Sequence, residues 1–461
     1  MDLDWDDTPV APVGQPATPL LQNDEPPQSS VKRPATRQAT KKRPAADMKH
    51  GATDPGKHVV VANVPLPDED SGVDDAKHRR EPRPSERIVN PNNDPTSVGA
   101  VTLLAKHRDK NLRVGHQRIT VGSDCAGMGS ELFALRGLGV NFQHCWASDI
   151  EPHVKKFHEA VHGCKAQWFD SIAQRNAANT CATDLYVAGF PCQPFSNAGR
   201  NAGIHDTRGN VFFEIAAHLE KALPRAFVLE NVFGLTTTHW PTFNLMLEMF
   251  SKIQLKDKPG QPSAYAISWK ILETSIHGGL PHHRLRVYVV GVRVDSLVAP
   301  MVWPEPTYMT PLSNIINVND AVSKADASKI YPPKSSTTLR ANVISVIRKV
   351  RKENPDVIND VVIDGDSSKT TYMIGKSPCL TRSRAGSGGF WLPCLGKRMG
   401  VKYVAKLQGY GYDYLLGKLA GDGKTPILTD RELGLMLGNA MTLPLLQRVL
   451  GALLRSAGLD N

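Results

Sequence analysis

The chain has 461 residues, 41% of them hydrophobic, and a formal net charge of +10 with a pI near 9.2. This length permits a large core, and the positive charge favours an acidic partner, most commonly nucleic acid. Seven scattered cysteines without a CxxC pair indicate neither a zinc site nor a disulfide framework, so we expect no metal. The acidic, polar N-terminus does not resemble a signal peptide, and no apolar run is long enough for a bilayer. We therefore expect a soluble intracellular protein that binds no membrane.

Residues 1–111 are rich in Pro, Asp, Lys, Arg, Ser and Thr and show no sustained periodicity. Such a segment buries too little apolar surface to offset its chain entropy, so it is predicted to be disordered. Within it, "KRPATRQATKKRP" (residues 32–44) carries two basic clusters around a short spacer. This pattern predicts a nuclear import signal, or else a DNA-contacting tail or a solvated basic linker. We expect the protein in the nucleus.

Residues 112–299 alternate strand-like and helix-like stretches, which predicts an α/β domain with a mostly parallel sheet. The predicted strands are ITVGS, HCWAS, DLYVAGF, RAFVLENV, YAISWKILETS and RLRVYVVGVR. Residues 300–376 lose this alternation and keep one helix-like stretch, ANVISVIRKVRKE, so they form a smaller insert or second domain. Residues 377–461 return to a compact pattern and end in a helix around Leu443 to Arg455.

The first predicted strand leads into "SDCAGMGSELFAL", a glycine-containing turn before a helix that lets a ligand approach the backbone. Asp149 ends the second strand, about 20 residues beyond the glycines, where a carboxylate accepts hydrogen bonds from ribose hydroxyls. Asp149 could equally cap the helix of EPHVKKFHEAV, and the two roles are compatible. Asp170 ends a possible third strand, within reach of an adenine amino group. Together these positions predict a nucleoside cofactor, while the absence of a GxxxxGK[ST] loop argues against a P-loop nucleotide.

In "VAGFPCQPFSNAGR" (residues 187–200), Cys192 follows a buried strand and lies between Pro191 and Pro194. The prolines restrict the backbone and fix the direction of the thiol at the edge where open α/β sheets place reactive groups. A small buried hydrophobic cysteine is the alternative. The polar loop behind Cys192 favours exposure and a mobile lid.

The next predicted strand ends in Glu230, which parallel pairing would place beside the thiol, and a buried strand-end carboxyl is costly without a partner. Arg284 and Arg286 alternate on the last predicted strand and point to one face. Taken alone, the two arginines are equally consistent with a solvated charge pair at the sheet edge.

Five motifs occur in order: AGMGS, PCQPFS, ENV, HHRLR and GNAM. Together they resemble the cytosine-C5 DNA methyltransferase family over most of residues 117–455. The sequence departs from the family pattern in four places: Cys125 replaces a Phe, Ser130 a Gly and His282 a Gln, and Val401-Lys402-Tyr403 replaces Pro-Arg-Glu.

The resemblance implies a class I S-adenosylmethionine-dependent methyltransferase fold whose target-recognition region is residues 300–376 and whose last helix packs on the first strand. It implies double-stranded DNA as the partner. It also implies that Cys192 attacks carbon 6 of a flipped-out cytosine, Glu230 holds N3 and the amine, Arg286 contacts O2 and Arg284 supports the pocket. Gln193 and Ser196 lie on the loop that closes over DNA. The implied S-adenosylmethionine-binding residues are Cys125, Gly127, Met128, Asp149, Ile150, Asp170, Ser171, Pro191, Val211 and Asn439.

Two other functions stay open. The first is the family's transfer-RNA branch, because "SPCLTRS" (residues 377–383) faintly resembles a Cys-Phe-Thr signature of that branch, which Leu380 interrupts. The second is a non-catalytic DNA- or chromatin-binding homologue, against which the presence of Cys192, Glu230 and Arg286 argues.

Overall fold

The computed structural model describes residues 118–163, 165–175, 178–191, 211–255, 263–316, 329–366, 369–423 and 425–460, without the side chains of 355 and 356. The predicted disordered tail and the predicted site residues Cys192, Gln193 and Ser196 lie outside the described residues. Contacts divide the chain into residues 1–59 and 60–461, and every described residue belongs to the second unit.

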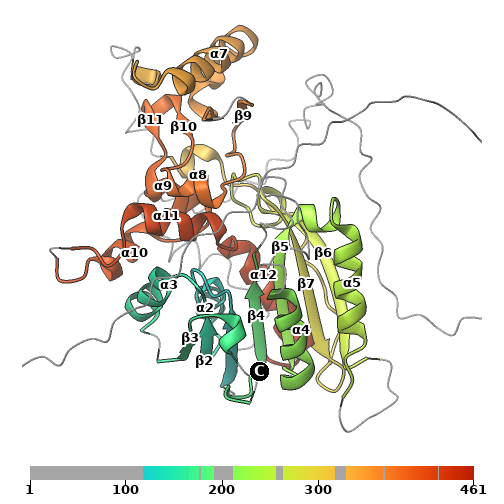
Figure 1. The fold of residues 1–461 in the computed structure, drawn as a ribbon. Helices are drawn as coiled ribbons and strands as arrows, with labels where there is room; N and C mark the ends of the chain where they lie inside the picture. Colours follow the sequence, from blue (N-terminus) through green and yellow to red (C-terminus); the bar gives the residue numbers. More distant parts are fainter. Residues whose placement is uncertain are drawn as a thin grey trace, which may run out of the picture. The chain divides into compact units, whose positions relative to one another are not determined.

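A seven-stranded sheet forms the centre of the described chain, in the order β3-β2-β1-β4-β5-β7-β6 (Figure 1). All neighbouring strands pair in parallel except β7, which is antiparallel to both β5 and β6. This mostly parallel sheet confirms the predicted class I methyltransferase fold. The strands are β1 Ile119–Asp124, β2 Phe142–Ser148, β3 Gln167–Phe169, β4 Leu185–Gly189, β5 Ala226–Val232, β6 Tyr265–Glu273 and β7 Leu285–Arg293.

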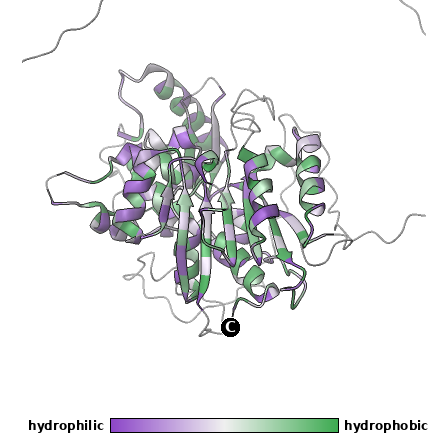
Figure 2. Cartoon of the chain, turned by 60° about the horizontal axis from the view of Figure 1, so that its bottom comes forward, coloured by the Kyte–Doolittle hydropathy of each residue, from purple (hydrophilic) through white to green (hydrophobic). Residues whose placement is uncertain are grey.

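Helices cover both faces of this sheet, so its inner strands are apolar on both sides. Alternate residues of β4 enter different cores: Leu185 and Val187 pack on one face, Tyr186 and Ala188 on the other. In Figure 2 hydrophobic residues accordingly run along the strands and on parts of the helices. The helical segments up to β7 are α2 Ser130–Leu138, α3 Pro152–Phe157, η1 His158–His162, η2 Ile172–Gln174, α4 Val211–Ala222, η6 Phe233–Thr236, α5 Trp240–Ser251 and α6 Thr274–His277.

The C-terminal helix α12, Leu443–Ser456, is buried along most of its length because its sequence, LPLLQRVLGALLRS, is apolar on nearly every side. It packs chiefly on α2 and also contacts β5 and β7, rather than resting mainly on the first strand as the resemblance implied. The helices that lead to it are α8 Arg382–Gly386, α9 Gly400–Leu407, α10 Tyr412–Leu419 and α11 Asp430–Asn439.

A second, four-stranded antiparallel sheet has the order β11-β10-β8-β9. Helix α7, Thr337–Glu353, follows η7 Leu312–Asn314 and precedes η10 Pro355–Asp360. It packs its apolar side on this sheet through residues that include Val343 and Ile347. The strands, β8 Val361–Asp364, β9 Thr371–Ile374, β10 Trp391–Leu392 and β11 Lys397–Arg398, extend beyond residue 376, and η11 Pro393–Leu395 lies between the last two. The predicted domain boundaries, including the target-recognition role of residues 300–376, stay predictions.

Among the described residues no single helix is long and apolar enough to cross a membrane. Helices α11 and α12 reach that length and composition only together, across a 43° bend.

Candidate active site

The end of β4 lies beside the end of β5, and this pairing defines the centre of the site. The two strands are parallel with Gly189 opposite Glu230, and Glu230 is buried, with 6% of its surface exposed. A Cβ added at Gly189 would lie 3.0 Å from Met441 Cε and 3.9 Å from Glu230 Oε2, so only glycine fits without displacement. The segment that continues toward Cys192 therefore leaves the sheet next to a buried carboxyl group.

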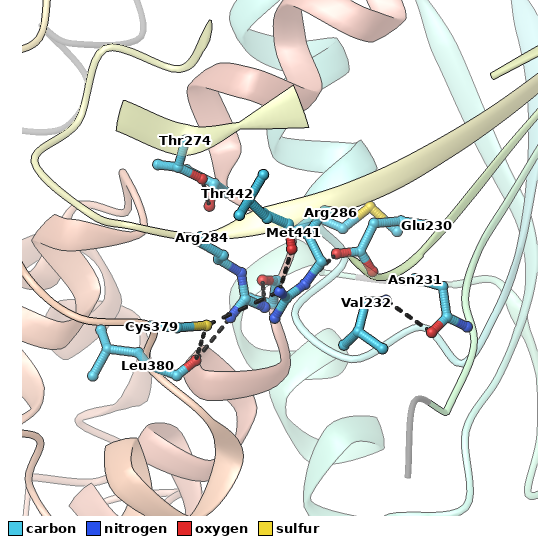
Figure 3. Close-up of polar contacts among 12 residues, drawn as sticks. Glu230, Asn231, Val232, Thr274, Arg284, Arg286, Cys379, Leu380, Met441 and Thr442 are labelled. Carbon is cyan, nitrogen blue, oxygen red and sulfur yellow. Dashed lines mark hydrogen bonds and ion pairs between the residues drawn. The ribbon is translucent and has the colours of Figure 1, made fainter. Parts of the chain in front are cut away.

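Arg286 supplies the positive charge that a buried carboxylate requires. Strand β7 runs antiparallel to β5 with Arg286 opposite Val232, and Arg286 Nε lies 3.0 Å from Glu230 Oε1. Both side chains are largely buried, and Figure 3 shows them facing each other. The structure thus brings together two predicted catalytic residues that are 56 positions apart in the sequence numbering.

Arg284 is fully enclosed and bonds to backbone oxygens from two distant segments. Its guanidinium donates to Leu380 O at 2.8 Å (Figure 3). It also donates to Gly438 O at 3.3 Å and to Ala440 O at 2.8 Å. Burial, followed by the charge of Arg286, lowers its pKa. Arg284 therefore joins the start of β7 to the carbonyls on either side of Asn439.

The position of the GNAM segment depends on helix α11, whose last residues are Gly438 and Asn439. The helix begins with a capping box in which Thr429 Oγ1 accepts from Glu432 N, and Glu432 Oε2 accepts from Thr429 N. It ends at Asn439, which is exposed. At Gly438 an added Cβ would lie 2.5 Å from Thr381 O, so the close approach of these two segments requires glycine.

His282, which stands where the resembled family has Gln, makes a buried hydrogen bond. Its Nε2 accepts a hydrogen bond from Leu380 N at 3.0 Å, and the residue is completely buried. Burial, and then the charges of Arg284 and Arg286, lower its pKa well below the usual range. His282 is therefore neutral and ties the arginine motif to residues 377–380.

Cys379 lies at the same site, although the sequence motifs did not assign it. Its Sγ is 4.0 Å from Arg286 Nη1. Burial alone would raise the pKa of this thiol, but Arg286 and Arg284 together outweigh burial and lower it. The only sequence signal was its position in SPCLTRS.

The glycine-containing loop after β1 is held by Asp149. Gly127 N donates to Asp149 Oδ2 at 2.9 Å, and Glu151 N donates to Oδ1 at 3.0 Å. Burial raises the pKa of Asp149. The N-cap of α3 is Glu151, so the alternative role of Asp149 as a helix cap is wrong. Cys125, Gly127 and Gly129 all have positive φ, and for Cys125 this backbone is uncommon.

The other predicted cofactor residues gather around the carboxyl ends of neighbouring strands. Ile150, next to Asp149, exposes 72% of its surface, which makes it an apolar platform at the end of β2. Asp149 N donates to Phe169 O at the end of β3, so Asp170 and Ser171 begin beside this platform. Met128 is buried, while Pro191 and Val211 are half-buried at the end of β4 and the start of α4. An exposed apolar surface beside two carboxylates fits a nucleoside.

Ser130, the second departure in the loop, makes a bond that a glycine cannot make. Tyr410 Oη donates its single proton to Met441 O at 3.1 Å. Ser130 Oγ lies 2.6 Å from Tyr410 Oη and must therefore be the donor to it. This chain of bonds joins the start of α2, directly after the glycine-containing loop, to Tyr410 and to Met441 of the GNAM segment.

A buried polar cluster beneath the loop was missed by sequence reasoning. Asp124, 1% exposed, pairs with Arg175 at 2.8 Å and accepts from Ser148 Oγ and Tyr186 Oη. Arg175 also donates to His218 Nδ1 at 2.6 Å. Only the position of Asp124 at a strand end hinted at this cluster. Within the described ranges, no group of three or more His, Cys, Asp or Glu side chains is arranged to hold a metal ion.

Known type II methyltransferases are similar to this chain. The type II methyltransferase M.NgoBI of Neisseria gonorrhoeae is 30% identical over 292 residues, 62% of this chain and 82% of that protein. M.HaeII of Haemophilus aegyptius is 34% identical over 198 residues, which are 43% of this chain and 57% of that protein. The matched region thus spans little more than half of M.HaeII.

Among solved structures, a DNA modification methyltransferase described as putative and encoded within an E. coli prophage aligns with a TM-score of 0.49 and 16% identity. The alignment covers 74% of this chain and 99% of that one. The family described as C-5 cytosine-specific DNA methylase matches residues 119–455. With the ordered motifs, the mostly parallel sheet and the paired Glu230 and Arg286, the chain belongs to the C-5 cytosine-specific DNA methylase family.

Proposed function

We propose that this protein is a DNA (cytosine-5-)-methyltransferase that uses S-adenosyl-L-methionine and forms a covalent adduct between Cys192 and carbon 6 of a flipped-out cytosine. The observation that carries the proposal is the buried Glu230–Arg286 pair, at 3.0 Å, beside the strand end that leads to Cys192. S-adenosylmethionine, when bound, supplies an electrophilic methyl group.

Carbon 5 of cytosine is a poor nucleophile, and addition of a thiolate at carbon 6 gives the ring enamine character. Cys192 is the thiol at the required place in the sequence. Glu230 holds the N3 and amine edge of the base and stabilises the adduct as charge develops. Arg286 contacts O2 and, through its pairing with Glu230, fixes the carboxyl group. After methylation, loss of the C5 proton releases Cys192.

The cofactor site would be formed by the loop of Gly127, the carboxyl of Asp149 and the platform of Ile150. Asp149 already accepts two backbone hydrogen bonds, so it positions the loop and keeps lone pairs for ribose hydroxyls. The exposed Ile150 side chain offers an apolar contact for an adenine ring.

The target base lies inside a duplex and must be extruded, at a cost of about a few kcal/mol. Residues 300–376 would line the opposite side of the DNA cleft and read base edges in the major groove. Helix α7 supports this proposal, because its last turns carry exposed Arg348, Lys349, Arg351 and Lys352. The basic clusters of residues 32–44 would direct the protein to the nucleus.

A duplex containing 5-fluorocytosine tests the covalent step, because fluorine at carbon 5 leaves no proton to abstract after methylation. With S-adenosylmethionine we expect a protein–DNA species stable to denaturing electrophoresis, linked at Cys192 by peptide mapping. Cys192→Ala should form none, and Glu230→Gln should form it slowly. Methylation of ordinary cytosine at the same site without a trapped adduct would show that the covalent mechanism is wrong.

Parallel assays with duplex DNA and transfer RNA, using labelled cofactor, define the substrate. We expect methyl transfer to DNA above the Cys192→Ala background. Transfer to RNA alone would assign the chain to the transfer-RNA branch, and transfer to neither substrate would leave a binding homologue.

A further inference from the structure

A cavity of about 580 Å³ lies away from the catalytic edge of the large sheet. Arg118 directly precedes β1 and Phe142 opens β2, so both mark the amino ends of these strands. The proposed cofactor and catalytic residues lie at the opposite, carboxyl ends. Its volume falls within the range of about 300–1,000 Å³ that is usual for small-molecule sites.

The cavity is cationic. Arg118, Arg136 and Lys165 line it, and none of the described residues that line it carries a carboxylate. Within the described ranges of the chain, none of these three cations forms an ion pair with a carboxylate. Three like charges around one hollow repel one another and attract an anion. Leu132, Val140 and Phe142 add an apolar wall, over part of which Arg136 lies, 5.9 Å from the Phe142 ring centre.

One of these cations is hydrogen-bonded to the cofactor loop through a histidine. Arg136 Nη1 lies 2.7 Å from His162 Nδ1, and because a guanidinium only donates, Nδ1 is the acceptor. Burial keeps His162 neutral by lowering its pKa well below the usual range. The remaining nitrogen, Nε2, therefore carries the proton and donates to Met128 O at 3.0 Å.

The contact between His162 and the loop is tight. A Cβ added at Gly129 would lie only 2.7 Å from His162 Nε2, so the ring packs against the loop backbone at a position where only glycine fits. A second histidine, His158, places its Nε2 3.2 Å from Gly127 O. A change at Arg136 therefore reaches the backbone that forms the proposed cofactor site.

We propose that this cavity binds a small phosphorylated organic molecule, and that Arg136 is shared between that ligand and His162, so that ligand binding weakens the hold on the cofactor loop. Phosphate oxygens match the guanidinium groups of Arg118 and Arg136, and the apolar wall accommodates the organic part. The effect on the loop rests on the proposed S-adenosylmethionine site, whereas anion binding does not.

The first experiment measures binding to the full-length protein by calorimetry at constant ionic strength, with inorganic phosphate, adenosine 5′-monophosphate and adenosine as probes. We expect saturable binding of the nucleotide, weaker binding of phosphate and none of adenosine at this site. Arg136→Gln should weaken nucleotide binding by about tenfold or more, since it removes a charge-assisted hydrogen bond. Lys252→Gln is the matched control, because it removes one exposed charge at the C-cap of α5, beside the half of the sheet that lies away from β1 and β2, and should change nothing.

The second experiment compares S-adenosylmethionine affinity with and without saturating nucleotide. We expect about fivefold weaker cofactor binding with the nucleotide, the reciprocal loss of nucleotide affinity with cofactor, and no coupling in Arg136→Gln. Because the probe contains adenine, direct competition for the cofactor site must be separated from coupling between two sites. Under competition the apparent dissociation constant of S-adenosylmethionine rises without limit as nucleotide increases, whereas under coupling it reaches a plateau.

Three results would overturn the proposal. Absence of saturable phosphate or nucleotide binding excludes the anion site, whatever the methylation assays show. Equal binding by the wild-type and Arg136→Gln proteins excludes the assigned residues. Displacement by duplex DNA, with no binding of the small phosphates, would make this surface a contact for the DNA backbone.

Discussion

Arg284, directly before β7, and Arg286, on β7, are only two residues apart, but they bind different partners. Arg284 donates to three backbone carbonyls in the interior. Arg286 pairs with the carboxyl group of Glu230. Their substitutions should therefore change different properties of the protein.

Arg284→Lys should lower the free energy of unfolding by about 2–3 kcal/mol, because one ammonium group cannot reach carbonyls on two sides as a planar guanidinium does. Arg286→Lys should cost less stability, since a lysine can still approach Glu230, but it should reduce methyl transfer. Urea denaturation and a methylation assay on both variants check this division. Equal loss of stability in the two variants would contradict it.

Asp149 accepts two backbone hydrogen bonds, one from Gly127 N in the glycine-containing loop after β1 and one from Glu151 N. Asp149→Ala should raise the dissociation constant of S-adenosylmethionine about tenfold or more, since a hydrogen bond to a charged group contributes roughly 1.5–3 kcal/mol. Isothermal titration calorimetry measures it, with Glu159→Gln, on η1, as a charge-matched control. An unchanged constant would restrict Asp149 to a structural role.

At the scale of elements, the turn between β6 and β7 is fixed by one buried carboxylate. Glu273 ends β6 and accepts from Ser275 Oγ at 2.5 Å, with His283 Nδ1 at 2.7 Å and Lys376 Nζ at 3.6 Å. Burial opposes ionisation, but these partners together outweigh it and lower the pKa of Glu273 to about 2. The carboxylate thus joins the arginine motif to the segment at residue 376.

A folded-state pKa below the unfolded value means that Glu273 stabilises the fold above about pH 4.5 and loses this contribution as pH falls toward 2. Glu273→Gln should therefore lower the free energy of unfolding by about 2 kcal/mol at pH 7, after allowance for solvent screening, and by less at pH 3. Denaturation curves at both pH values test this, with the exposed Glu248→Gln as control. A difference between wild-type and variant that stays constant with pH would contradict the assignment.

At the scale of the whole molecule, we expect the first hundred residues to carry a nuclear import signal and no catalytic residue. Removal of residues 1–100 should leave methyl transfer to short DNA largely intact and lower nuclear accumulation, because the basic clusters of residues 32–44 are lost. Fluorescence imaging and a methylation assay on the truncated protein check the two parts. Retained nuclear enrichment would show that another signal is sufficient, and lost activity would show that the segment helps to bind DNA.

The sequence by itself determined the class of fold and, through five ordered motifs, the family. Strand periodicity and glycine turns are properties of contiguous residues, so ITVGS and RLRVYVVGVR were found as strands close to their observed bounds. The four short strands β8 to β11 were missed, because segments of two to four residues carry too little periodicity.

Only the tertiary structure decided which partners the buried polar side chains bind. The carbonyl partners of Arg284 lie 96 to 156 positions away, Arg175 reaches Asp124 across 51 positions, and His282 bonds to Leu380 across 98. The same packing showed that Asp149 binds the loop instead of capping α3. Local pattern fixes which face a side chain occupies. Its partner across the sheet depends on how distant segments approach, and that is decided by the requirement that buried polar groups find one another.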